Sequence, residues 1–140
     1  MLFNIISLLV VLLASAMAVA DTVYLVRHAE KHAEGKDPAL TACGQARADA
    51  LASSLAGVKL AAVYSTPYQR TRQTAAAVAK QQQLDITSYD PRQPEVLVKQ
   101  LTTLNQSALV VGHSNTVPEL VAQLSGIAIA ALTEQDYDLL

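Results

Sequence analysis

Short apolar runs alternate along the chain with longer segments in which apolar residues recur at helical spacing. The short runs predict buried strands, because a strand covered on both faces needs few polar side chains. The predicted strands are residues 22–26, 60–64, 84–87 and 108–111. The longer segments predict helices at residues 41–57, 67–82, 96–104 and 117–124.

This order of elements indicates an α/β fold. Helices of about 10–15 residues between strands are typical of crossover units, which place helices on both faces of a parallel sheet. We therefore expect a three-layer α/β/α sandwich with a mostly parallel sheet, formed by residues 21–140. Residues 137–140 have the character of the start of a further strand. Whether the domain lacks that last strand is left open.

The first 20 residues have the pattern of a leader rather than of a folded element. They carry no charged side chain, Ile5–Leu13 is almost continuously apolar, and Ala18–Ala20 supplies small residues before Asp21. We expect a signal peptide cleaved after residue 20, which makes the protein periplasmic or secreted, without stable membrane insertion. A retained N-terminal anchor is the alternative, because the apolar run is just long enough to span a bilayer.

Composition narrows the classes of function. The chain has 140 residues, a net charge of -2, one cysteine, one phenylalanine and no tryptophan. No intrachain disulfide and no Cys-rich zinc site can form. Without a basic field or an aromatic stacking surface, nucleic-acid binding is not expected.

Histidine and arginine residues follow the predicted strands. Arg27 and His28 come after the first strand, Arg70 follows the second, and His113 follows Gly112 at the end of the fourth. Ligands of parallel sheets bind outside the carboxyl ends of the strands. Two arginines can bind a dianion with paired N–H groups, and a neutral histidine between them can act as a nucleophile. The residues therefore predict a phosphate pocket with a nucleophilic imidazole.

Three sequence blocks resemble the signatures of the histidine phosphatase superfamily, which includes cofactor-dependent phosphoglycerate mutase. They are LVRHAE at residues 25–30, YSTPYQRTRQTA at 64–75 and VVGHS at 110–114. LTACGQA at residues 40–46 is similar to the family segment that opens the first helix. The resemblance covers about residues 22–124, and the small size and leader are most similar to short exported bacterial members close to small phosphohistidine phosphatases.

The resemblance implies a role for each matched residue. His28 would be the nucleophile, forming a phosphohistidine that water hydrolyses. Arg27, Arg70 and His113 would bind the phosphoryl oxygens and stabilise the transition state. The substrate would be a phosphomonoester or phosphoramidate, and no metal ion or cofactor is implied, because the cations are side chains.

The proton donor for the leaving group is not marked by any block, since its position varies in the family. Glu95, after the third predicted strand, is the first candidate, and Glu30 and Glu119 are alternatives. Lys31 is a candidate contact for an anionic substrate. Ser114 could donate a hydrogen bond in the pocket, although a turn or cap role explains it equally well.

Other functions are weaker interpretations. A serine hydrolase is disfavoured because Thr116 stands where the second glycine of a nucleophile elbow belongs and no histidine follows Ser114. A metal site at His28 and His32 would need a helix where a loop is predicted. A mutase would need a long insertion as a lid. A non-catalytic module that binds a phosphoryl ligand in the same pocket remains the alternative to an enzyme.

The sequence does not identify the substrate. Short loops predict an open site that would admit a phosphorylated small molecule, a phosphorylated sugar of the cell envelope or a phosphoprotein.

Overall fold

The computed structural model describes residues 21–137. The predicted leader at residues 1–20 lies outside the described residues, and so do residues 138–140 of the predicted last strand. Tyr137, the first residue of that prediction, is not in a strand. Within residues 21–137, no helix has the length and apolar character needed to cross a membrane.

The sheet has four parallel strands. In spatial order they are β1, β4, β2 and β3, and the bounds are Val23–Arg27, Ala108–Gly112, Ala62–Ser65 and Ile86–Ser88. The central strand β4 pairs with β1 from Val23 opposite Ala108 to Arg27 opposite Gly112. The carboxyl ends of β1 and β4 therefore lie side by side.

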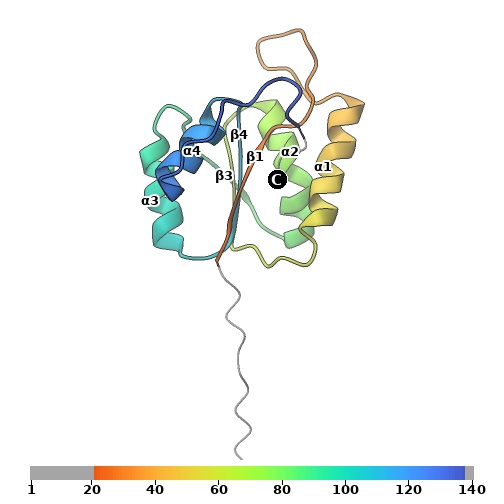
Figure 1. Ribbon diagram of the computed structural model, residues 1–140. Coiled ribbons are helices and arrows are strands. Elements are labelled where there is room, and N and C mark those ends of the chain that lie inside the picture. Colours follow the sequence, from red (N-terminus) through yellow and green to blue (C-terminus); the bar gives the residue numbers. More distant parts are fainter. Residues whose placement is uncertain (1–20, 138–140) are drawn as a thin grey trace, which may run out of the picture.

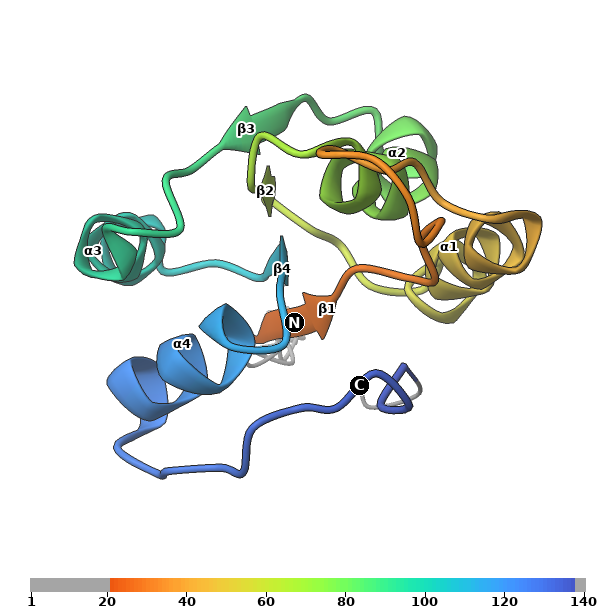
Figure 2. The same ribbon diagram turned by 90° about the horizontal axis from the view of Figure 1, so that it is seen from above.

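Two helices cover each face of the sheet (Figures 1 and 2). On one face lie α1 and α2, and on the other lie α3 and α4; their bounds are Ala42–Ser54, Gln69–Gln82, Pro94–Leu104 and Thr116–Ser125. The predicted α/β fold with three layers is confirmed. The first helix begins where the sequence predicts, since the side chain of Thr41 accepts a hydrogen bond from the Gly44 N–H at 3.0 Å.

Alternate residues of the strands enter two separate cores. Leu109 packs in a cluster with Val63 and Val78, on the side of α1 and α2. Its neighbour Val110 packs with Leu97, on the side of α3 and α4. Both residues of β4 are completely buried, which explains why the predicted strands are apolar throughout rather than alternating.

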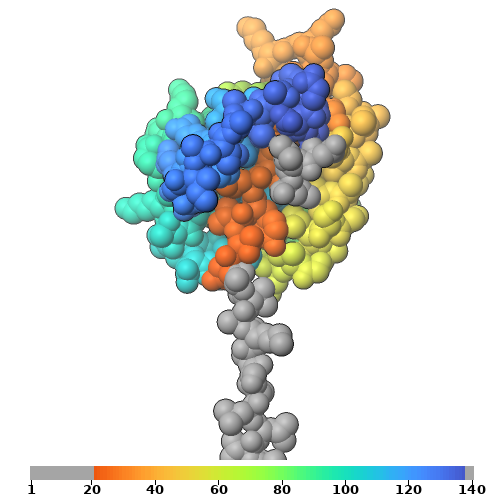
Figure 3. All heavy atoms as spheres, viewed as in Figure 1, coloured from red at the N-terminus to blue at the C-terminus, as the bar shows by residue number. Residues whose placement is uncertain are grey.

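The segment after α4 has no regular secondary structure. It runs back across the end of the molecule at which β1 and β4 terminate, and it lies next to the loop that follows β1 (Figures 2 and 3). This return brings residues 133–137 to the edge of the sheet where the predicted site residues lie.

Candidate active site

Six of the seven residues predicted for the site line one cavity of about 390 Å³ at the carboxyl ends of β1, β2 and β4. They are Arg27, His28, Lys31, Arg70, His113 and Ser114. Thus three parallel strands and the loops after them assemble residues that are far apart in the sequence, as expected for ligand sites of such sheets.

His28 is held in one tautomer by its neighbour. The ring Nδ1 lies 2.8 Å from the carbonyl oxygen of Ala29. A carbonyl oxygen only accepts hydrogen bonds, so Nδ1 carries the proton and Nε2 keeps its lone pair. The main-chain N–H of His28 also donates to the Gly112 carbonyl at 3.0 Å, which fixes the residue to the end of β4.

The same ring stays uncharged in the free protein. Burial, together with the positive charges of Arg27 and Arg70, lowers the pKa of His28 to about 4. The hydrogen bond to the Ala29 carbonyl opposes this shift without overcoming it. A neutral imidazole with a free Nε2 is the form that a nucleophile requires.

His113 lies beside His28, with the ring centroids 5.5 Å apart and the ring planes at 66°. Its Nε2 is 2.9 Å from the hydroxyl of Thr66, which is 2.8 Å from the hydroxyl of Thr71. Both threonines are completely buried. Burial lowers the pKa of His113 to about 4, with a further contribution from the charge of Arg70.

Each of the two site arginines has an unsatisfied donor. The Nε atoms of Arg27 and Arg70 are buried and have no hydrogen-bond partner among the described residues. Buried N–H groups without an acceptor are costly, and the cost is removed when a ligand supplies the acceptor. The pair is suited to an anion with several oxygen atoms, such as a phosphoryl group.

Protein groups also contact both arginines. The guanidinium of Arg70 lies 3.7 Å from the carboxylate of Asp37 and 4.6 Å from the ring centroid of Tyr68. The guanidinium of Arg27 lies 3.0 Å from the carboxylate of Glu134, and it also donates to the carbonyl oxygen of Thr133. Each cation therefore has contacts with protein groups besides its unpartnered Nε donor.

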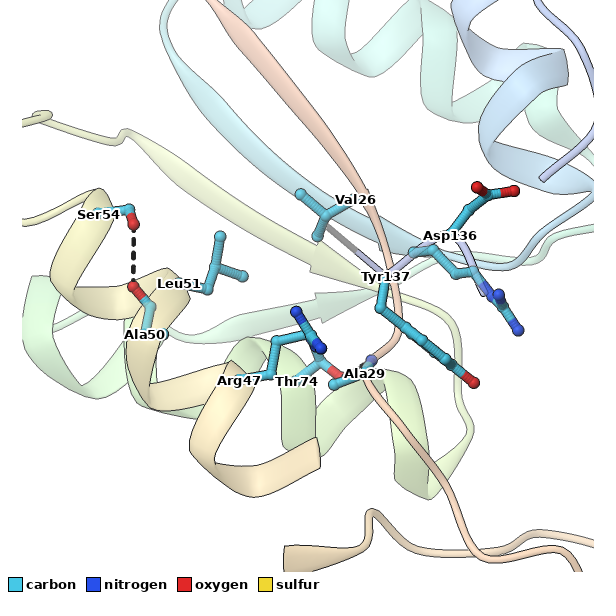
Figure 4. A pocket seen from close by; sticks show the side chains of 10 residues that line it. Val26, Ala29, Arg47, Ala50, Leu51, Ser54, Thr74, Asp136 and Tyr137 are labelled. Carbon is cyan, nitrogen blue, oxygen red and sulfur yellow. Dashed lines mark hydrogen bonds between the residues drawn. The ribbon is translucent and has the colours of Figure 1, made fainter. Parts of the chain in front are cut away.

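Arg27 also borders a second, smaller cavity of about 140 Å³ between β1 and α1 (Figure 4). Tyr137 and Asp136 line one end of it, and Leu51 and Ser54 of α1 line the other. The ring of Tyr137 lies 4.6 Å from the Arg27 guanidinium carbon and 5.7 Å from that of Arg47. Tyr137 therefore packs against Arg27 from the side of this second cavity.

The predicted proton donor, Glu95, is not brought to the cavity. It lies exposed in the first turn of α3 and is not among the residues that line the site. The alternative Glu30 is bound by both Nε and Nη2 of Arg47 at 2.6–3.0 Å, and these hydrogen bonds lower its pKa. The alternative Glu119 is exposed in α4. None of these three lines the cavity.

Sequence reasoning missed Glu134, the one Asp or Glu that lines the cavity among the described residues. It belongs to none of the sequence blocks described above, so no local signal marks it. Tyr68 and Arg92 also line the cavity and were not predicted. Within residues 21–137, no group of three or more His, Cys, Asp or Glu side chains could hold a metal ion.

A parallel sheet with two arginines and two histidines at its carboxyl edge defines a phosphoryl-binding α/β protein, and comparison with known families agrees. The profile of the histidine phosphatase superfamily (branch 1) matches residues 23–93, just over half of the chain. The chain therefore belongs to the histidine phosphatase superfamily and is a phosphatase. A search of curated proteins gave no match.

Solved structures of similar fold come from phosphatases of this kind. The protein histidine phosphatase SixA, complexed with tungstate, is 24% identical, with a TM-score of 0.67 over 79% of this chain and 81% of that chain. A candidate phosphohistidine phosphatase SixA from Agrobacterium tumefaciens is 25% identical, with a TM-score of 0.64 over 78% and 80%. A candidate alpha-ribazole-5'-P phosphatase from Escherichia coli K-12 is 21% identical, with a TM-score of 0.66 over 75% and 80%.

Proposed function

We propose that this phosphatase hydrolyses phosphomonoesters or phosphoramidates without a metal ion, through a phosphohistidine on His28. The hydrogen bond between His28 Nδ1 and the Ala29 carbonyl carries the proposal, because it leaves the Nε2 lone pair free. His28 lines the same cavity as Arg27 and Arg70, whose buried Nε donors have no partner among the described residues. A nucleophile and the binding groups for its target are thus side by side.

In the first step, Nε2 of His28 attacks phosphorus as the bond from phosphorus to the leaving group breaks. Arg27 and Arg70 bind the non-bridging oxygens, and their positive charges stabilise the transition state. His113 donates an N–H to the same oxygens. In the second step water attacks phosphorus, the P–N bond breaks, and phosphate leaves with neutral His28 restored.

The substrate class is a phosphorylated small molecule or a phosphoprotein. The 25% identity to the Agrobacterium protein, which is named as a phosphohistidine phosphatase, supports a phosphoramidate on a protein. The cavity also contains Lys31 and Arg92, and their positive charges favour substrates with a second anionic group. A phosphorylated sugar of the cell envelope is the substrate proposed if the protein is exported.

The test is a rapid-quench assay with p-nitrophenyl phosphate in EDTA, on protein purified after expression of the full chain. His28→Ala is the variant, and His32→Ala is its control, since His32 is an exposed histidine of the following loop. We expect acid-labile phosphate on the wild type and the control, and none on His28→Ala. Folded wild-type protein that binds phosphate without turnover would instead establish the non-catalytic binding module.

A further inference from the structure

The segment after α4 is fixed at several points over the edge of the site. The N–H of Leu132 lies 3.4 Å from the carbonyl oxygen of Ser114, which lines the cavity. The next residues form a closed turn, in which the Thr133 N–H donates to the Asp136 carboxylate at 2.6 Å and the Asp136 N–H donates to the Thr133 carbonyl at 3.1 Å. Tyr137 then packs against Arg27.

This turn places the carboxylate of Glu134 in the wall of the cavity. One carboxylate oxygen lies 3.0 Å from Nη2 of Arg27, and the other accepts a hydrogen bond from the Tyr137 hydroxyl at 3.3 Å. Its side chain is 69% exposed, whereas that of Arg27 is 3% exposed. Glu134 is thus next to the phosphoryl-binding groups and can still exchange protons with water.

Two other carboxylates lie close to the site, but each is hydrogen-bonded to another protein group and neither lines the cavity. Asp37 accepts a hydrogen bond from the Gln69 N–H at 2.9 Å and does not line the cavity. Asp90 belongs to an adjoining hollow, and its hydrogen bonds from Arg92 lower its pKa to about 2. Asp90 does not line the cavity either.

We propose that Glu134 is the general acid and base of the reaction, an assignment that rests on the proposed function. The protonated carboxyl gives its proton to the leaving-group oxygen as the P–O bond breaks and the bond from His28 Nε2 to phosphorus forms. The resulting carboxylate then takes a proton from the water molecule that attacks phosphorus, as the P–N bond breaks. The second step restores both the protonated carboxyl and neutral His28.

Binding of substrate supplies the protonated form of Glu134. In the free protein, the charge of Arg27 holds the pKa of Glu134 below its usual range. A bound phosphoryl dianion takes the place of Glu134 on Arg27 and puts negative charge beside the carboxylate, and both changes favour protonation. The ion pair therefore holds the carboxylate at the site until a substrate arrives.

The experiment measures phosphohistidine formation on wild type, Glu134→Gln and Glu134→Asp in single turnovers with two substrates. Nitrophenolate leaves without a proton, whereas the alkoxide of glycerol phosphate needs one. We expect Glu134→Gln to slow formation from glycerol phosphate about 100-fold or more, and from p-nitrophenyl phosphate less than about tenfold. Glu134→Asp should recover part of the loss, and trapped phosphohistidine should persist longer on Glu134→Gln, which lacks the base.

The control is Glu34→Gln, the same change at an exposed glutamate that does not line the cavity. Equal slowing with both substrates, no slowing, or faster formation in Glu134→Gln would overturn the assignment while the phosphohistidine mechanism stands. Absence of phosphohistidine from wild-type protein with either substrate would overturn the proposed function, and this assignment with it. The two failures are therefore distinct.

Discussion

The hydroxyl of Thr66 lies 2.9 Å from Nε2 of His113, and this contact fixes the orientation of the ring in the site. Thr66 is completely buried. We predict that Thr66→Val, which keeps the shape and removes the hydroxyl, destabilises the protein by about 1–3 kcal/mol, because buried polar groups lose their partner. It should also lower kcat about tenfold, by the loss of one hydrogen bond to a site group. Thr66→Ser, which retains the hydroxyl, should keep the stability and the kcat of the wild type. Urea unfolding measures the first and steady-state kinetics the second.

The low pKa values of His28 and His113 predict an unusual titration. Both rings should titrate near pH 4 in the free protein rather than near 6.5, as NMR of the imidazole protons would show. In the unfolded chain the same rings bind protons near pH 6.5. Their contribution to the free energy of unfolding is therefore complete above pH 6.5 and declines as the pH falls toward 4. Midpoints near 6.5 in folded protein would contradict the burial of the site.

The two arginines of the same helix provide a test of phosphate binding. Arg70 lines the cavity, whereas Arg72 is exposed. Arg70→Lys keeps the charge and loses the planar fork of donors, so we expect phosphate to inhibit this variant about 10-fold less effectively. Arg72→Lys should bind phosphate as the wild type does. Inhibition of p-nitrophenyl phosphate hydrolysis by inorganic phosphate measures both.

Gly44 is required by close packing of α1 against the loop after β1. A Cβ atom at this position would lie 2.1 Å from the carbonyl oxygen of Glu30, which is backbone and cannot rotate away. Gly44→Ala should therefore destabilise the protein by about 2–3 kcal/mol. A Cβ at Gly57 meets nothing within 4 Å, so Gly57→Ala should change stability by less than about 0.5 kcal/mol. Chemical denaturation of the two variants compares them directly.

The signal peptide that the sequence predicts at residues 1–20 can be tested directly. Expression of the full chain in a bacterial host should give a product that begins at Asp21, because signal peptidases cleave after small residues such as those at Ala18–Ala20. Intact-mass measurement of protein released from the periplasm tests this. Full-length protein in the membrane fraction would support the anchor.

Local sequence patterns were sufficient to predict most of the fold and half of the residues that line the cavity. The strand before Arg27 and the strand before His113 are visible as apolar runs, and parallel strands end at one edge, so the meeting of these residues follows from the sequence. Glu95 also lies after a strand, but α3 begins at Pro94 and leaves that side chain exposed in its first turn. A position shortly after a strand was therefore not enough to predict that Glu95 would line the cavity.

Glu134 could not be predicted in the same way. Its place depends on the path of residues 126–137, which form no helix or strand although residues 127–132 are an apolar run. That path is determined by long-range contacts, such as those of Arg27 with Thr133 and Tyr137. Contacts between residues more than 100 positions apart leave no pattern in either segment.

The order of strands has a consequence for how the active protein forms. In the described sheet, β1 has one neighbour, β4, and Val23 pairs with Ala108, 85 residues later. The strand that precedes His28 therefore cannot pair until most of the chain has been synthesised, and closing so long a loop slows folding. During refolding, the ability to bind phosphate should return only when the sheet is complete. A phosphate analogue would thus report the last stage of folding, after helical structure has already formed.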